Sequence, residues 1–228
     1  MTTVQSDFIR EIAPLLQKYA LANGYSIAVV PAMIAQACVE SFYKGGLSSL
    51  AARYHNYWGM KAGAGYTGST VNMSTGEEYS RGTITQIRDN FRTYANMSEG
   101  VLGYMRFLNY SNYRACKSAR TPEEFAKALK AGRWATSYSY VNSIMNAVKN
   151  YDLTKYGMGE PKAVSYGGVV TATALNVRSY PGGDIVQVGG HNFLLPFGIC
   201  VAFEAELNGW AKLSGVDGWV SLTYIQKG

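Results

Sequence analysis

The sequence predicts an α+β protein in which a mainly helical part is followed by a small all-β part. Apolar side chains recur at helical spacing over residues 6–153, interrupted by a strand-prone stretch at residues 69–94. Over residues 168–228 the pattern changes to short alternating runs broken by glycine, which is typical of strands joined by tight turns. We therefore expect a helical domain with a small β-hairpin lobe at residues 1–155, a linker at 156–167 and an all-β domain at 168–228.

Two helices are expected before the hairpin. The first runs from about residue 6 to residue 23, where Asn23 and Gly24 end it, and Pro14 should bend it because proline lacks a backbone donor. The second carries Pro31 in its first turn, where proline is tolerated, and it ends near Glu40. Both helices present apolar residues at the spacing that packs one face against a core.

The hairpin and the helices after it follow from local signals. Thr83 to Ile87 are strand-prone, and Gly76 and Gly82 are expected to punctuate a hairpin that forms the second lobe of a cleft. Helices are expected again at residues 98–109 and 121–131, and an apolar stripe from Val141 to Val148 marks the last one.

Glu40 is the one charged residue in the apolar helical segment PAMIAQACVESF, and it lies near the end of that segment. Desolvation beside an apolar face raises the pKa of a carboxyl group, so a glutamate in this position can hold a proton and act as an acid. Taken alone, such a residue more often faces water at a helix end. The neighbouring segments decide between these interpretations.

Four segments follow one another in a recognisable order: AQACVES, SSLAARYHNYWGMKAGAGY, GEEYSRGTITQIRDNFRTY and GRWATSYSYVNSIMNAVKNYDL. Together they resemble the bacterial glucosaminidases of glycoside hydrolase family 73, over roughly residues 6–153. The resemblance implies a lysozyme-like fold and an endo-β-N-acetylglucosaminidase that cleaves peptidoglycan. It implies no cofactor and no metal ion.

The resemblance also implies roles for individual residues. Glu40 corresponds to the general acid, and Glu78 to the acidic residue of the hairpin, with Glu77 as the alternative register. Tyr140 corresponds to a tyrosine near the reacting bond. The residues that correspond to substrate contacts are Asn56, Trp58, Gly59, Trp134 and Tyr138.

Two positions depart from the family pattern, since Trp134 stands where a tyrosine is usual and Ser137 where an aspartate is usual. The mechanism stays open between two routes. Glu78 can act as a base for an inverting attack by water, or the substrate's acetamido group can attack while Tyr140 orients it. Two other functions also remain: a muramidase or lytic transglycosylase of lysozyme type, and a wall-binding protein without catalysis.

The segments ALNVRS, NGWAKL and GWVSLTYI resemble the bacterial SH3-like wall-binding domain, over residues 168–228. Asn208-Gly209 and Asp217-Gly218 supply hairpin turns, and Tyr180 and Tyr224 are candidates for binding a wall ligand. The whole chain is similar to a phage endolysin or an autolysin. Residues expected to line a small barrel are Leu175, Val177, Val201, Trp210, Val220 and Ile225.

The charge and composition limit the partners. The net charge of +6, from 21 basic and 15 acidic residues, favours an anionic partner. The basic residues are dispersed and form no nucleic-acid motif, so we expect no nucleic acid. The expected partners are peptidoglycan glycan strands and wall peptides, with anionic wall polymers in addition. No segment reaches the roughly 20 apolar residues of a membrane span, and we expect a monomer that is not embedded in a membrane.

Cysteine and histidine usage disfavours other wall-degrading chemistries. Cys38 lies in an apolar helical stretch and Cys200 in a strand-like run, so both are expected to be buried free thiols. His55 and His191 fall in different predicted domains, whereas a zinc amidase needs a cluster of ligands.

The beginning of the sequence, MTTVQSDFIREIAPLLQKYA, lacks the basic and then uninterrupted apolar segments of a secretory signal. We expect a protein that acts at the bacterial cell wall. Two routes are open: synthesis in the cytoplasm with release through a holin-type membrane lesion, as in a phage lysin, or a chain recorded without its leader.

Overall fold

The chain divides into two units, Met1–Gly157 and Met158–Gly228. The computed structural model describes residues 1–80 and 83–228, and it describes side chains outside residues 76–85. Within the described chain, none of the helices combines the length and apolar character that a membrane span requires.

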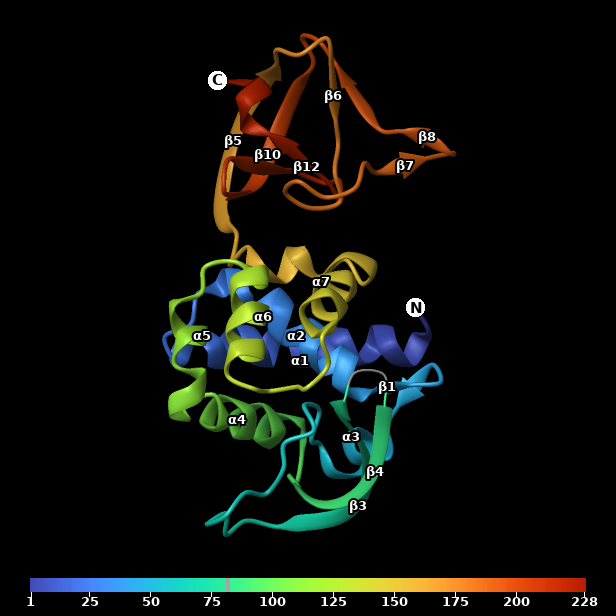
Figure 1. Ribbon diagram of the computed structural model, residues 1–228. Coiled ribbons are helices and arrows are strands. Elements are labelled where there is room, and N and C mark those ends of the chain that lie inside the picture. The colour runs from blue at the N-terminus through green and yellow to red at the C-terminus, as the bar shows by residue number, and fades with distance from the viewer. Residues whose placement is uncertain (81–82) are drawn as a thin grey trace. The chain divides into compact units, whose positions relative to one another are not determined.

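The first unit is mainly helical and carries one long β-hairpin (Figure 1). Its helices are α1 (Thr3–Ala22), α2 (Val30–Ser41), α3 (Ser49–Tyr54), α4 (Met97–Phe107), α5 (Ala115–Ser118), α6 (Pro122–Ala131) and α7 (Tyr140–Asn150). Short 3-10 turns are η1 (Ile27–Val29), η2 (Ser111–Tyr113) and η3 (Leu153–Gly157). Its strands are β1 (Phe42–Tyr43), β2 (Gly46–Leu47), β3 (Thr70–Ser80) and β4 (Thr83–Arg92).

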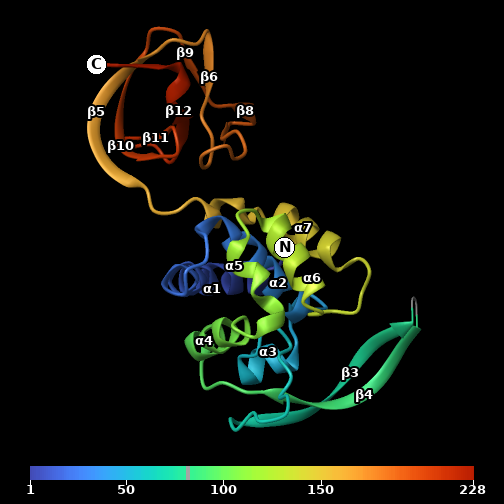
Figure 2. The same cartoon turned by 60° about the vertical axis from the view of Figure 1, so that its left-hand side comes forward.

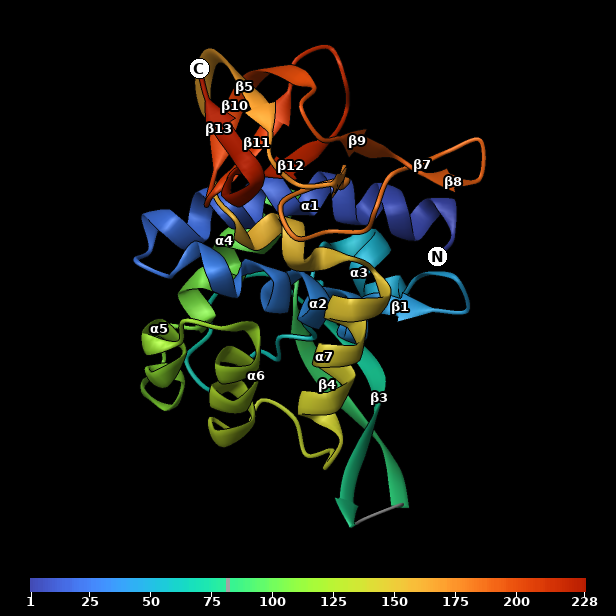
Figure 3. The same ribbon diagram turned by 90° about the horizontal axis from the view of Figure 1, so that it is seen from above.

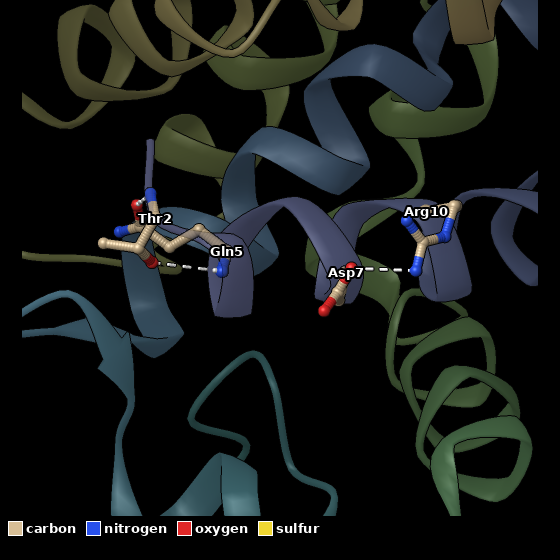
Figure 4. A network of polar contacts seen from close by, with 4 residues as sticks. All are labelled: Thr2, Gln5, Asp7 and Arg10. Carbon is tan, nitrogen blue, oxygen red and sulfur yellow. Dashed lines mark hydrogen bonds and ion pairs between the residues drawn. The ribbon is translucent and has the colours of Figure 1, made fainter.

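Helix α1 begins three residues earlier than the apolar periodicity predicts, and its N-terminal cap explains why. The Thr2 hydroxyl accepts from the backbone of Gln5 at 3.3 Å, and the Gln5 side chain accepts from the Thr2 N–H at 2.9 Å (Figure 4). This reciprocal pair satisfies two backbone donors that the first turn would otherwise leave unpaired. The Asp7–Arg10 ion pair on the next turn, 2.8 Å long, is exposed and therefore adds little stability.

Helix α2 is the centre of the first unit. It packs against α1, α6 and α7, and all its residues except Val39 and Glu40 are buried. A helix that is apolar on every side is stable only inside a core, and here the core residues of the surrounding helices enclose it. The end of this helix is therefore held rigidly by its surroundings.

The β3–β4 hairpin forms a two-stranded antiparallel sheet that extends away from the helices (Figures 2 and 3). This agrees with the predicted hairpin at residues 69–94. Gly76, expected to punctuate the hairpin, lies inside β3 opposite Gln86, whereas Gly82 falls outside the described residues.

The base of the hairpin is fixed by Arg92, a charged side chain that is only 6% exposed. Its guanidinium carbon lies 4.3 Å from the ring centre of Tyr66 and 4.7 Å from that of Phe107. Its Nε donates to the Lys61 carbonyl at 3.1 Å and its Nη2 to the Tyr110 hydroxyl at 3.0 Å. Arg92 therefore joins the loop after Met60 to α4 and to the end of β4.

The second unit is an all-β unit built on a five-stranded antiparallel sheet of order β12-β11-β10-β5-β13. The edge strands β12 and β13 do not pair with each other, so the sheet is a half-barrel, and the closed SH3-like barrel is not confirmed. Two-stranded sheets pair β6 with β9 and β7 with β8. The elements are β5 (Lys162–Val170), β6 (Ala174–Asn176), β7 (Gln187–Val188), β8 (His191–Asn192), β9 (Leu194–Pro196), β10 (Cys200–Leu207), β11 (Trp210–Leu213), β12 (Trp219–Ser221), η4 (Leu222–Tyr224) and β13 (Ile225–Lys227).

Strand β5 begins at Lys162, so residues 162–167 are strand where the sequence suggested linker. Gly168 packs closely against Ile225, and a larger residue would not fit there, because an added Cβ would lie 2.5 Å from Ile225 Cγ2. Most of the expected core residues are buried, but Val201 and Trp210 are only partly so.

Of the three cysteines, Cys38 and Cys116 are buried and free, as expected for Cys38. The expectation for Cys200 is wrong: it is exposed, because its position in β10 points outward, while Phe203 faces the core.

Candidate active site

A cleft of about 920 Å³ lies in the first unit between the helices and the proximal part of the hairpin. Its walls come from the end of α2, the turn before the hairpin, strand β3, and the loop that joins α6 to α7. Described residues that line it include Glu40, Trp58, Gly59, Lys61, Met73, Ser74, Thr75, Arg133, Trp134, Ser137 and Tyr140.

Glu40 is the penultimate residue of α2 and is partly exposed at the cleft. The helix ends directly after it, where Phe42 turns to an extended conformation and the Ser41 hydroxyl donates to the Tyr57 carbonyl at 2.7 Å. Gly59 lies close by with a left-handed φ of +63°, and a Cβ added there would lie 3.9 Å from Glu40 Oε2. The apolar helix thus delivers a carboxyl group to the cleft wall.

Tyr140 contacts Glu40 directly, although the two residues are 100 positions apart. The Tyr140 hydroxyl donates a hydrogen bond to Glu40 Oε1, with 2.7 Å between the oxygens. Burial raises the pKa of this hydroxyl well above its usual value, and the neighbouring charge of Glu40 raises it further. Tyr140 is therefore a protonated donor over the whole range of physiological pH.

Two buried residues continue this contact into the core. Gln36 Nε2 donates to the Tyr140 hydroxyl at 3.0 Å, and the Tyr104 hydroxyl donates to Gln36 Oε1 at 2.5 Å. The Tyr104 ring is stacked on Trp58 with 4.0 Å between ring centres. Gln36 and Tyr104 are each fully buried, so these hydrogen bonds are shielded from water.

Gln36 and Tyr104 are not among the site residues that the sequence motifs indicate. Gln36 precedes Glu40 by four residues, which is one helical turn, and it is the other polar side chain in the apolar middle of α2. That spacing is a signal that could have indicated a side chain on the same helix face as Glu40. No such sequence signal marks Tyr104, because the residues around it in α4 have the apolar pattern of an ordinary core helix.

Asn56 lies in the interior and serves the backbone. Its Nδ2 donates to the carbonyls of Met60 and Arg92, both at 2.9 Å, and its Oδ1 accepts from the Met60 N–H at 2.9 Å. Asn56 is 1% exposed. Its side chain therefore holds the turn that carries Trp58 and Gly59, in contrast to the substrate contact that the resemblance implied.

The loop between α6 and α7 forms a further part of the cleft wall. Trp134 is partly buried and packs edge-on against Tyr104 and Phe107. Tyr138 is 74% exposed and Lys130 lies against its ring. Arg133, which the sequence analysis passed over, lines the cleft and has a left-handed φ of 63°.

Glu77 and Glu78 lie on β3, where they pair with Thr85 and Ile84. Their side chains are outside the part of the structure that is described.

The candidate ligand residues of the second unit differ in exposure. Tyr224 is 48% exposed, while Tyr180 is partly buried and its ring covers Gly183, where an added Cβ would lie 2.5 Å from Tyr180 Cε1. Phe197 is 70% exposed.

The sequence matches, over residues 16–153, the glucosaminidase family described as mannosyl-glycoprotein endo-beta-N-acetylglucosaminidase. This match covers more than half of the chain and contains Glu40, Tyr140 and the hairpin. The chain belongs to the glucosaminidase family. The family predicted from the four sequence segments is thereby confirmed.

Curated relatives are bacterial wall hydrolases by name. A probable N-acetylmuramidase of Lactococcus lactis subsp. cremoris (strain MG1363) is 31% identical over 157 residues, which are 65% of this chain and 34% of that protein. The peptidoglycan hydrolase FlgJ of Salmonella typhimurium is 28% identical over 96 residues, 42% of this chain and 30% of that protein. The chain thus spans about a third of the length of these relatives.

A solved structure shows the same fold. The catalytic domain of the autolysin Auto from Listeria monocytogenes superposes with a TM-score of 0.55 and 28% identity, over 68% of this chain and 89% of that domain. A peptidoglycan hydrolase mutant from Sphingomonas sp. A1 has a TM-score of 0.54 at 24% identity, over 67% of this chain and 97% of that one, and supports the fold alone.

Proposed function

We propose that this protein is a peptidoglycan hydrolase of the endo-β-N-acetylglucosaminidase type, with Glu40 as the general acid. The position of Glu40 is the observation that carries the proposal: a carboxyl group at the end of an apolar helix, in a cleft, held by the hydroxyl of Tyr140. Membership of the glucosaminidase family and the names of the relatives support the substrate class.

Cleavage of a glycosidic bond needs a proton for the leaving oxygen and stabilisation of a cation-like transition state. In our proposal Glu40 supplies the proton as the bond breaks. The Tyr140 hydroxyl orients the carboxyl group and stabilises the carboxylate that remains. Glu78 supplies a base for water, or the substrate's own acetamido group attacks, and the position of Tyr140 beside Glu40 is compatible with both.

The cleft lining suits a sugar chain. Trp134 offers an apolar ring face, and Ser74, Thr75 and Ser137 offer hydroxyl groups. Sugar rings are recognised by such a combination of apolar contact and a few placed polar groups. We propose Gly59, Trp134 and Tyr138 as substrate-contacting residues. Asn56 and Trp58 were implied to be contacts as well, but each is only 1% exposed, and we assign both to support of the cleft wall.

A second candidate activity is that of an N-acetylmuramidase, which cuts the other glycosidic bond of the same strand. It is favoured by the name of the Lactococcus lactis relative, whose similarity covers 65% of this chain. A lytic transglycosylase would use a single glutamate in the same way, without water as the acceptor.

Mass analysis of digested peptidoglycan tests these alternatives. The proposed activity produces fragments with N-acetylglucosamine at the reducing end. Reducing-end N-acetylmuramic acid would instead establish a muramidase, and anhydro-muramic ends a transglycosylase. Purified wall that yields no new reducing or anhydro ends would overturn the proposal of an enzyme and leave a wall-binding protein.

For the second unit we propose wall binding, with the aromatic side chains of Tyr180 and Tyr224 as ligand contacts. The exposure of Tyr224 supports this proposal. We further propose that the protein acts at the bacterial cell wall, as an endolysin or autolysin does.

A further inference from the structure

We infer that Gln36 and Tyr104 are positioning residues that hold the Tyr140 hydroxyl in the orientation in which it donates to Glu40. The inference rests on the proposed function, because it assigns Glu40 a catalytic role. It concerns two side chains that lie behind the cleft and contact Glu40 only through Tyr140 in the hydrogen bonds described above.

The donors and acceptors of this chain run in one direction. Tyr104 donates to the carbonyl oxygen of Gln36, the amide nitrogen of Gln36 donates to the Tyr140 oxygen, and Tyr140 donates to Glu40. An amide nitrogen can only donate, so the Tyr140 oxygen must accept at this contact. The hydroxyl proton of Tyr140 is then left to point at Glu40.

Tyr104 determines which way the Gln36 amide faces. If the amide turned over, its carbonyl oxygen would face Tyr140 and compete with Glu40 for the Tyr140 proton. The hydroxyl of Tyr104, 2.5 Å from Gln36 Oε1, holds the carbonyl on the far side. Burial makes this constraint strong, because a buried polar atom that loses its partner is costly and water is not at hand to replace it.

The ring of Tyr104 is itself fixed. It stacks on Trp58 with an angle of 4° between the planes, and it meets Trp134 edge-on at 5.8 Å. Both tryptophans line the cleft, so the packing of the cleft wall and the orientation of the Tyr140 proton depend on the same ring. Removing only the hydroxyl of Tyr104 leaves that packing in place and isolates its polar role.

The test is a double-mutant cycle in the full chain, assayed on soluble peptidoglycan fragments. Tyr104→Phe is expected to lower kcat about fivefold, the effect of about 1 kcal/mol, and to leave KM within about twofold. In a Tyr140→Phe background the same substitution should change kcat by less than about twofold, because the hydroxyl that it positions is gone. Gln36→Leu should show the same dependence on Tyr140.

Tyr25→Phe is the matched control. Tyr25 is buried in the same core, with 3% of its surface exposed, and its hydroxyl has no hydrogen-bond partner among the described residues. Its replacement should leave kcat and KM unchanged. Thermal melting of each variant shows whether the fold is retained.

A second readout does not depend on activity. In protein labelled with ¹³C at tyrosine Cζ, Tyr104→Phe should shift the Tyr140 resonance, and Tyr25→Phe should not. A Tyr140 resonance that stays in place, or a loss of kcat that is equal with and without the Tyr140 hydroxyl, would overturn the inference. Failure of the proposed function has a different signature, since Glu40→Gln would then leave activity unchanged while the resonance still shifts.

Discussion

The two units of the protein differ in what they bury. Among the residues whose side chains are described, the buried polar and charged ones are Gln36, Ser41, Asn56 and Arg92, and all four belong to the first unit. The second unit has an apolar core that includes Phe203, and it exposes other aromatic side chains, as at Tyr224 and Phe197. Buried polar groups are costly unless they are paired, so a unit that keeps four of them is organised around a site.

This difference suggests that catalysis belongs to the first unit and adhesion to the second. The buried polar side chains of the first unit surround the cleft: Gln36 behind Tyr140, Ser41 at the end of α2, Asn56 beneath the turn and Arg92 at the base of the hairpin.

The largest effect is expected at Glu40. Glu40→Gln keeps the shape of the side chain but cannot donate the proton, so wall hydrolysis should fall by a factor of about 100 to 10,000. Glu123→Gln is the control, because Glu123 is exposed on α6 and its pair with Lys127 is a surface ion pair. Turbidity clearance of a wall suspension measures both, and equal rates for parent and Glu40→Gln would exclude Glu40 as the acid.

A smaller but still large effect is expected at Tyr140. Tyr140→Phe removes the donor to Glu40 Oε1 and should lower kcat about tenfold to a hundredfold, within the range of a lost charge-assisted hydrogen bond. An unchanged kcat would remove Tyr140 from the site.

Comparison with Glu78→Gln then separates the two mechanisms. If water attacks with Glu78 as base, this variant should be nearly as impaired as Glu40→Gln, and NMR of the first product should show inversion. If the acetamido group attacks, Tyr140→Phe should be the more impaired variant and the product should retain its configuration.

The second unit should affect wall binding and leave the chemistry unchanged. A chain shortened to residues 1–160 should keep its rate on soluble fragments and lose about tenfold on intact wall, because tethering raises local concentration. The cut preserves Gly157, which packs on Pro31, and the Tyr156 carbonyl that accepts from Gln17. Equal losses on both substrates would contradict the separation of roles.

The smallest effects are expected for single aromatic side chains of the second unit. Tyr224→Ala and Tyr180→Ala should each weaken cosedimentation of residues 158–228 with purified wall a few-fold. The effect of Tyr224→Ala should be the larger of the two, because Tyr224 is the more exposed side chain. Binding that vanishes at moderate salt would instead indicate attraction between charges alone.

The sequence predicted the helix that carries Glu40 because a lone charge in an apolar run is visible without any tertiary information. The hairpin was equally visible from its strand-prone residues. Asn56 was not, because its partners are the backbone of Met60 and of Arg92, 36 residues away. A residue within a sequence motif can thus hold a turn, and only the fold distinguishes that role from a substrate contact.

In the second unit, local patterns predicted strands and turns but missed two longer-range features. Residues 162–167 were taken for part of a linker because their strand partner, β10, lies far along the chain. Closure of the sheet depends on whether β12 and β13 pair, which no local sequence pattern indicates. Both features depend on contacts between distant parts of the chain.

The aromatic surroundings of Arg92 also bear on which side chains the base of the hairpin can accept. A guanidinium is planar, donates from several nitrogens in a fixed geometry and stacks on aromatic faces, which the ammonium group of a lysine does not reproduce. The contacts of Arg92 with Tyr66, Phe107 and the Lys61 carbonyl therefore depend on the shape of its head group as well as on its charge. A lysine in its place would keep the charge and still lose the attachment of the loop that brings Lys61 to the cleft.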